Sequence, residues 1–167
     1  MKTNMKKYIA LTMTLLGTAV AGLAQTANGT LTIQGTVAST VSITVAPLGG
    51  YNTLDIVNGV AAQNVANITE KTNDKNGYKV TMTSLNAGGS GSSLFLKDTA
   101  VGVDTAPYSL TYNGSAVTFS TGSATLTDVS SRTAQAGVVK ALAVTIASSW
   151  VNSATYADTL TFTITGK

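Results

Sequence analysis

Residues 108–119 read Tyr-Ser-Leu-Thr-Tyr-Asn-Gly-Ser-Ala-Val-Thr-Phe, and this stretch decides the class of fold. Apolar and polar residues alternate on both sides of Asn113-Gly114, which is the pattern of two strands that each bury one face. Asn-Gly tolerates the positive φ angles that a two-residue type I′ turn requires. The stretch therefore predicts a β-hairpin in which Tyr112 faces Ser115 across the ladder.

The same period-two alternation recurs along the rest of the chain, between turns that are rich in Gly, Asn and Ser. Strands spaced about every ten residues and joined by such turns indicate an all-β antiparallel sandwich. The clear segments are 30–37, 41–45, 78–83 and 159–165, and weaker ones are 54–57, 64–70, 94–97, 124–129 and 138–147.

The first 24 residues have the pattern of a secretory signal peptide. Lys2, Lys6 and Lys7 precede an apolar run over 8–20, and Gly22-Leu23-Ala24 places small residues where a signal peptidase cuts. We expect cleavage before Gln25, which removes 24 of the 167 residues and leaves 143. The apolar run is shorter than the ~20 residues of a spanning helix, so we expect an exported protein with no membrane span.

The net charge of +3 belongs to this signal segment. Without it, seven Lys and Arg face seven Asp and Glu, and the remaining chain is neutral. No basic cluster is left to follow a phosphate backbone. We therefore expect no binding to nucleic acid.

The chain contains neither His nor Cys, which removes most catalytic chemistry. Ser-His and Cys-His pairs, thiolates and ordinary zinc sites are excluded. The seven acids stand singly, and Asp74-Lys75-Asn76-Gly77 lacks the downstream Glu of a calcium loop, so it predicts a tight turn. We expect no enzyme activity, no cofactor and no metal site.

Both ends of the chain resemble a known family. The alternating segment 30–37 leads into Val41-Ser42-Ile43, and the chain closes with Tyr-Ala-Asp-Thr-Leu-Thr-Phe-Thr-Ile over 156–164. Together with 77–84, these stretches resemble secreted pilins of the chaperone-usher type, in the archaic branch grouped with spore coat protein U. The chain differs from many members in having no Cys and in ending on Gly166-Lys167.

This resemblance implies an immunoglobulin-like sandwich that lacks its last strand and is completed by strand donation from a neighbouring subunit. It implies a signal peptide over 1–24, a donor strand over 25–38 and a sandwich domain over 39–167. The implied partners are copies of the same chain in a head-to-tail fibre, a periplasmic chaperone and an outer-membrane usher, and the implied role is adhesion or biofilm at the cell surface. The implied donor residues are Leu31, Ile33, Gly35 and Val37, and the implied acceptor residues are Leu160, Phe162 and Ile164.

Two alternatives stand beside this reading. Alternation alone also allows 30–37 to be the first strand of a complete, monomeric sandwich. Such a sandwich could be a secreted binding module for carbohydrate or another surface, with aromatic side chains as stacking platforms. The aromatic candidates are Tyr51, Tyr108, Tyr156 and Trp150, of which Trp150 is the residue we expect to be available for ligand stacking.

Overall fold

The computed structural model describes residues 26–87, 93–100 and 104–167. The predicted signal peptide over 1–24 lies outside the described residues. A compact domain spans Val37–Lys167, and the chain before it forms a separate unit. All residues of the hydrophobic core belong to this domain.

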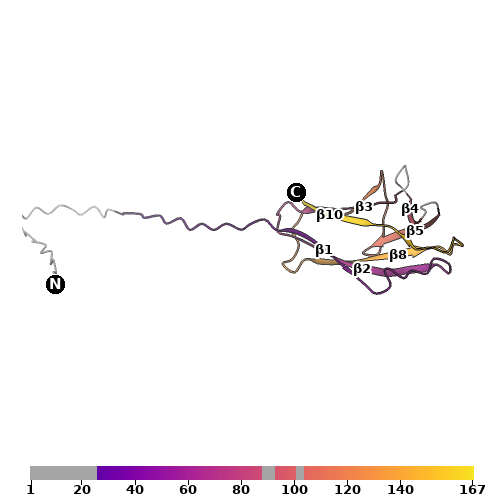
Figure 1. Ribbon diagram of the computed structural model, residues 1–167. Coiled ribbons are helices and arrows are strands. Elements are labelled where there is room, and N and C mark those ends of the chain that lie inside the picture. Colours follow the sequence, from indigo (N-terminus) through magenta and orange to yellow (C-terminus); the bar gives the residue numbers. More distant parts are fainter. Residues whose placement is uncertain (1–25, 88–92, 101–103) are drawn as a thin grey trace, which may run out of the picture. The chain divides into compact units, whose positions relative to one another are not determined.

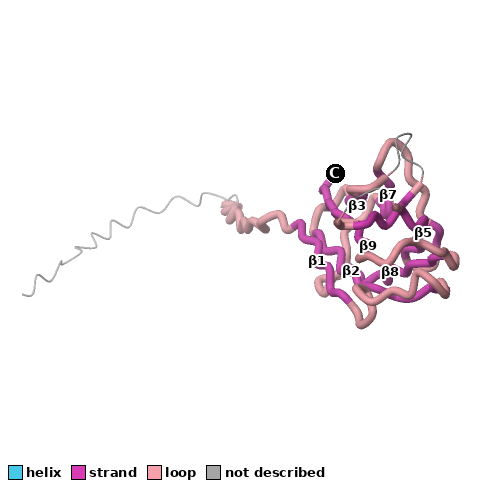
Figure 2. Tube along the Cα trace, turned by 45° about the vertical axis from the view of Figure 1, so that its right-hand side comes forward, coloured by secondary structure: helices cyan, strands magenta, loops and turns pink. Residues whose placement is uncertain are grey.

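The domain is built from strands in two antiparallel sheets, and the described residues contain no helix (Figures 1 and 2). This confirms the predicted all-β sandwich. The larger sheet has the order β1-β2-β8-β5-β4-β9 with β6 paired to β5, and the smaller sheet has the order β10-β3-β7. The strands are β1 (Val41–Pro47), β2 (Val60–Thr72), β3 (Tyr78–Ser84), β4 (Leu94–Asp98), β5 (Thr105–Tyr112), β6 (Ser115–Ala116), β7 (Ser123–Val129), β8 (Val138–Ile146), β9 (Tyr156–Ala157) and β10 (Leu160–Gly166).

The hairpin predicted at 108–119 is confirmed at its turn. Tyr112 faces Ser115, and Asn113 and Gly114 have φ angles of 49° and 81°. The second strand is shorter than expected and ends at Ala116. Phe119 turns into the core, where it is 3% exposed, so burial of this ring ends the ladder.

Two of the predicted strands are absent from the structure. Residues 54–57 form a turn, because the chain there connects β1 to the start of β2. Residues 30–37 carry no strand assignment and are exposed. An alternating segment without a hydrogen-bonded neighbour has little stability as a strand, so its sequence pattern alone does not make it one. The other predicted strands are confirmed.

Glu70 lies in the core between the sheets, and its side chain is fully enclosed. Its Oε1 accepts hydrogen bonds from the Tyr112 hydroxyl at 2.6 Å and the Thr127 hydroxyl at 2.7 Å. Its Oε2 accepts from the Tyr78 hydroxyl at 2.8 Å and lies 2.9 Å from Lys140 Nζ. These residues come from five strands in both sheets, so the cluster ties the two layers together.

The hydrogen bonds keep Glu70 charged inside the core. Burial by itself raises the pKa of a carboxyl, but the hydrogen bonds from Tyr112, Thr127, Lys140 and Tyr78 hold the pKa of Glu70 below its ordinary value. Burial is also the main reason why the pKa values of Tyr78 and Tyr112 are raised, with the nearby Glu70 charge adding to it. Both hydroxyls therefore remain donors.

We expect Glu70→Gln to destabilise the domain, because it leaves Lys140, whose side chain is only 16% exposed, without its carboxylate. Breaking a buried ion pair in this way costs about 3–5 kcal/mol of unfolding free energy. Urea unfolding at pH 7 measures the change. Asp128→Asn, at an exposed carboxylate, is the matched control and should barely move the midpoint.

The Glu70→Gln variant also tests how strongly the stability of the domain depends on acid pH. A carboxyl with a lowered folded pKa stabilises the domain above its unfolded pKa of about 4.3, and this contribution disappears as pH falls through the folded pKa. The native domain should therefore lose more stability between about pH 5 and 2 than Glu70→Gln. Equal losses in the two proteins would contradict the assignment of the buried charge.

Candidate functional site

In the described part of the chain the two sheets have four edge strands, and two of these, β1 and β10, lie side by side with one unpaired edge each. In the described part of the chain, β1 is paired with β2 alone and β10 with β3 alone. The two strands run in opposite directions, and Val41 at the start of β1 lies beside Gly166 at the end of β10. No ladder joins them there, so each presents a row of free backbone groups along one side.

The two ends of the sandwich can be defined from the strand register. The base is the end at which Val41 faces Thr72 and Gly166 faces Tyr78. It carries the turn 73–77, the loop 130–137 and the C-terminus. The head is the opposite end, and it carries the loops 48–59 and 147–155 and the described residues between β4 and β5.

An apolar cavity of about 350 Å³ opens between β1 and β10 in the half nearer the head. We call it the groove. Its floor is the buried core of the larger sheet, and its walls are the two strands with free edges. It is lined by Val45, Pro47, Tyr51, Leu54, Val65, Ala66, Leu96, Tyr108, Leu110, Leu142, Val144, Asp158, Thr159, Leu160 and Phe162.

The apolar residues of these two strands are not fully covered. Phe162 is half-buried, whereas its cross-strand neighbour Met82 on β3 is fully buried. Leu160 and Ile164 are also half-buried, and Val45 on β1 remains 44% exposed. Of the three acceptor residues predicted from the sequence, Leu160 and Phe162 line the groove, whereas Ile164 lies on the same face of β10 beyond its lining, with apolar surface still accessible.

The head end of the groove is closed by the carboxylate of Asp158. Its Oδ2 accepts hydrogen bonds from the Tyr108 hydroxyl at 2.5 Å and the Ser84 hydroxyl at 2.6 Å. Its Oδ1 accepts from the backbone N–H of Asn86 and of Thr159. Because Tyr108 lies on β5 and Ser84 on β3, this carboxylate connects the two sheets where the groove begins.

The predicted donor residues are exposed. Leu31, Ile33 and Val37 have 85%, 89% and 88% of their side-chain surface accessible, and no atom lies within 4 Å of a side chain added at Gly35. Residues 26–40 carry no strand. An apolar, alternating segment and an apolar groove therefore occur in one chain, and both remain uncovered.

Asn73 fixes the point at which this segment joins the domain. Its side-chain Nδ2 donates to the Ala38 carbonyl at 2.7 Å, and its Oδ1 accepts from the Thr40 N–H at 2.7 Å. Asn73 N–H also donates to the Thr40 carbonyl. Since Asn73 follows β2 at the base, residues 38–40 are held at the base of the domain.

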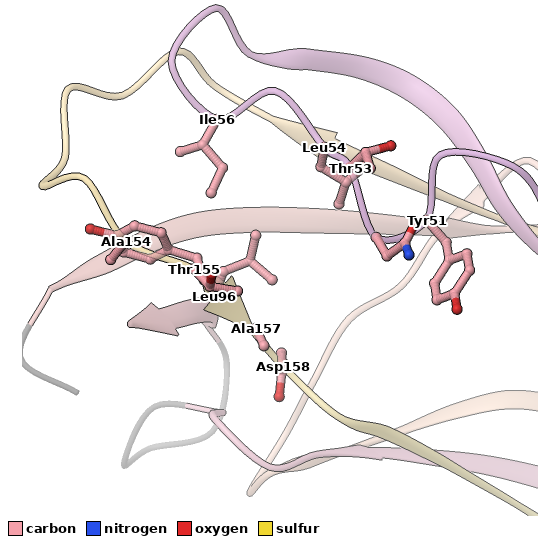
Figure 3. Close-up of a pocket in the computed structure, with 11 residues that line it drawn as sticks. Tyr51, Thr53, Leu54, Ile56, Leu96, Ala154, Thr155, Ala157 and Asp158 are labelled. Carbon is pink, nitrogen blue, oxygen red and sulfur yellow. The ribbon is translucent and has the colours of Figure 1, made fainter. Parts of the chain in front are cut away.

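The head carries two shallow clefts beside the groove. One, of about 490 Å³, lies between the loop containing Tyr51 and Leu54 and the segment 154–158 (Figure 3). The other, of about 630 Å³, is lined by Asp55, Trp150, Asn152 and Tyr156, among others. Trp150, the predicted stacking residue, is 92% exposed and contributes to this second cleft.

The loop that carries Trp150 is held by hydrogen bonds on both sides. Ser149 N–H donates to the Ile56 carbonyl, and Asn152 N–H donates to Asp104 Oδ2 at 2.8 Å. The bonds from Asn152 and from the Tyr156 hydroxyl hold the pKa of Asp104 below its ordinary value. Burial, followed by the Asp104 charge, raises the pKa of Tyr156 to about 12.

The other aromatic candidates do not form a stacking platform with Trp150. Tyr108 is buried, and its hydroxyl is bound to Asp158. Tyr156 is half-buried with its hydroxyl at Asp104, and Tyr51, although 53% exposed, lines the other cleft. Of the four aromatic candidates, Trp150 is therefore the most exposed, at 92% against 53% for Tyr51.

Sequence reasoning treated the seven acids as unrelated single residues and missed Glu70 and Asp158 as inter-sheet ties. A signal for Glu70 was present, since it continues the inward-facing series of Ala66 and Ile68 on β2. A charged residue at an inward-facing, buried position of a strand requires a partner of opposite charge or hydrogen-bond donors. Its hydroxyl donors lie up to 57 residues away in the sequence, which is why the pattern alone could not identify them.

Comparison with known proteins does not assign the chain to a family. No protein-family model matches it, and no curated protein matches it. Within the described residues, no three His, Cys, Asp or Glu side chains gather in a way that could hold a metal ion. The same residues include no apolar helix of membrane-spanning length.

The free edges predict a pattern of amide exchange. In β1 and β10, the amides that point away from the neighbouring strand should exchange rapidly with solvent, while β3, paired on both sides, should be protected throughout. Hydrogen exchange measured by NMR on the monomeric chain provides the test. Protection of every amide in Leu160–Gly166 would show that a further strand covers this edge.

Proposed function

We propose that the protein is the structural subunit of a fibre in which residues 31–37 of one copy fill the groove of the next. The observation that carries the proposal is the coexistence of an exposed, alternating apolar segment with an apolar groove between two unpaired strand edges. Addition of a strand to such an edge satisfies backbone groups on both sides and buries alternate side chains. The resemblance to chaperone-usher pilins supports the same arrangement.

The donor and the acceptor edge match in length and phase. Leu31–Val37 and Leu160–Gly166 both span seven residues, or about 23 Å of strand at 3.3 Å per residue. Leu31, Ile33 and Val37 share one face, as the half-buried residues of β10 do. Insertion therefore places every apolar donor residue on the core side of the sandwich.

The topology sets the direction of insertion. Residues 38–40 leave each domain at its base, so the donating domain must lie at the head of the acceptor if the contact is to repeat. Residue 37 then lies at the head of the groove and residue 31 at its base, antiparallel to β10. The reverse direction would press two bases together and leave no room for a third copy.

In the fully overlapped antiparallel register, Gly35 falls opposite Phe162, the largest side chain of β10. A residue without a side chain leaves room for this ring, so the one gap in the apolar series lies where the acceptor contributes most volume. Head-to-tail contacts of this kind do not close on themselves and produce an open fibre.

An open groove is an aggregation hazard before assembly, and it needs temporary cover. The resemblance supplies a periplasmic chaperone for this role and an outer-membrane usher for assembly. With the predicted signal peptide over 1–24, the proposed location is the cell surface, reached through the periplasm. The proposed use of the fibre is adhesion or biofilm formation.

Ile33→Asp should abolish polymerisation of residues 25–167, because it would bury an unpaired carboxylate in the groove. Thr32→Asp is the matched control, since it places the same charge on the opposite face of the donor. We expect SDS-resistant oligomers from the native chain and from Thr32→Asp, and monomers from Ile33→Asp. Gel electrophoresis without heating measures the difference.

The monomeric Ile33→Asp chain retains an intact groove and should capture an acetylated peptide of residues 26–38. The same peptide with Ile33→Asp should bind at least about 100-fold more weakly, a loss of about 2.7 kcal/mol. A native chain that is a stable monomer and captures no peptide would instead support a complete sandwich, with a binding-module function.

A further inference from the structure

The charged residues are scattered in the sequence but sorted in the folded domain. At the head, four carboxylates accompany one cation, which gives a net charge of −3. The sequence contains no charged residue over 88–92 or 101–103. The head residues are Asp55, Asp98, Asp104, Asp158 and Lys97.

The base has the opposite balance. Five cations accompany two carboxylates, which gives a net charge of +3 before the terminal carboxylate is counted. Glu70 and Lys140, the one remaining pair, neutralise each other inside the core. The neutral domain is therefore polarised from end to end. The base residues are Lys71, Lys75, Lys79, Arg132, Lys167, Asp74 and Asp128.

At both the head and the base, some of the charged side chains line a cleft. At the head, the cleft of about 630 Å³ combines the exposed carboxylate of Asp55 with the exposed ring of Trp150. A carboxylate beside an indole face is a favourable environment for a Lys or Arg head group. At the base, a cleft of about 610 Å³ beside the exit point of the donor segment is lined by Lys71 and Arg132.

The proposed fibre brings these two surfaces together. Four Cα–Cα steps separate Val37, at the head of the acceptor, from Val41 at the base of the donating domain. Such a link spans at most about 14 Å, and Asn73 holds part of it against the base. The opposite charges of the two ends would then face each other across this short link.

We propose that the acidic head of each copy docks against the basic base of the next copy, with Asp55 and Trp150 receiving cations that include Arg132. This inference rests on the proposed function and adds a second contact to it. Strand insertion joins the copies, and end-to-end docking sets how they are oriented about the short link. The partner of the head is therefore a second copy of this chain.

The two contacts can be separated experimentally because the donor segment 25–40 contains no charged side chain. Insertion of an acetylated donor peptide should therefore be nearly independent of salt. Docking between the ends should weaken steeply as salt screens the charges, since the Debye length falls to about 3 Å at 1 M. If salt changes the contact between copies in the polymer but does not change peptide capture, the change reports on the docking of the two ends.

Trp150 is the single Trp of the chain, so its fluorescence reports on the head alone. The experiment compares acrylamide quenching in the native polymer and in the Ile33→Asp monomer. At low salt we expect quenching in the polymer to be reduced about threefold, because the neighbouring base covers the ring. At about 1 M NaCl it should return to the monomer value while the SDS-resistant oligomers persist.

Arg132→Gln should leave peptide capture unchanged and make Trp150 more accessible in the polymer at low salt. Thr125→Glu is the matched control, because it lowers the net charge equally at an exposed position away from both ends. A Trp150 that is equally accessible in polymer and monomer would overturn the docking while leaving the fibre intact. Failure of both polymerisation and peptide capture would instead overturn the proposed function, and the docking with it.

Discussion

The structure depends on one constraint, which is that the sandwich has two neighbouring strand edges without partners. Elsewhere the inward-facing residues of the inner strands are buried, as Val80 and Met82 are on β3. Along β1 and β10 the apolar residues remain partly accessible, and a groove separates the strands. The chain supplies a segment of matching length and alternation. In the proposed fibre, this segment leaves the domain at the base and enters the groove of another copy.

The two sheets of the sandwich must be kept in place by contacts across the core. The chain has no Cys, so no disulfide can do this. Two carboxylates occupy corresponding positions at the two ends of the core. Near the base, Glu70 on β2 is contacted by donors from four other strands, and Asp158 joins β3 to β5 at the head of the groove. Both carboxylates accept hydrogen bonds from Tyr hydroxyls. A Tyr side chain suits this position because it combines a large apolar ring with a polar tip.

The sequence was sufficient to predict the strands whose pattern is local. The turn at Asn113-Gly114 and the alternation of β10 specify their own structure, and both were found as expected, although the second strand of the hairpin is shorter than predicted. The prediction of a strand over residues 54–57 was wrong, because a short apolar run does not distinguish a strand from a turn packed against the core. The groove was expected only through the family resemblance. The buried carboxylates and the sorting of charges were not predicted, since each depends on which distant strands become neighbours. Asp55 and Asp104, for example, share the head only because of the order of strands in the larger sheet.

The most direct test of strand exchange uses the absence of Cys in the native chain. In the antiparallel register, Thr36 of one copy lies opposite Thr161 of the next, whereas parallel insertion would bring Thr32 opposite Thr161. We predict that the double variant Thr36→Cys, Thr161→Cys forms a ladder of disulfide-linked multimers under mild oxidation, and that Thr32→Cys, Thr161→Cys does not. Multimers from the second variant alone would contradict the direction of insertion, and the absence of multimers from both would contradict strand exchange between copies.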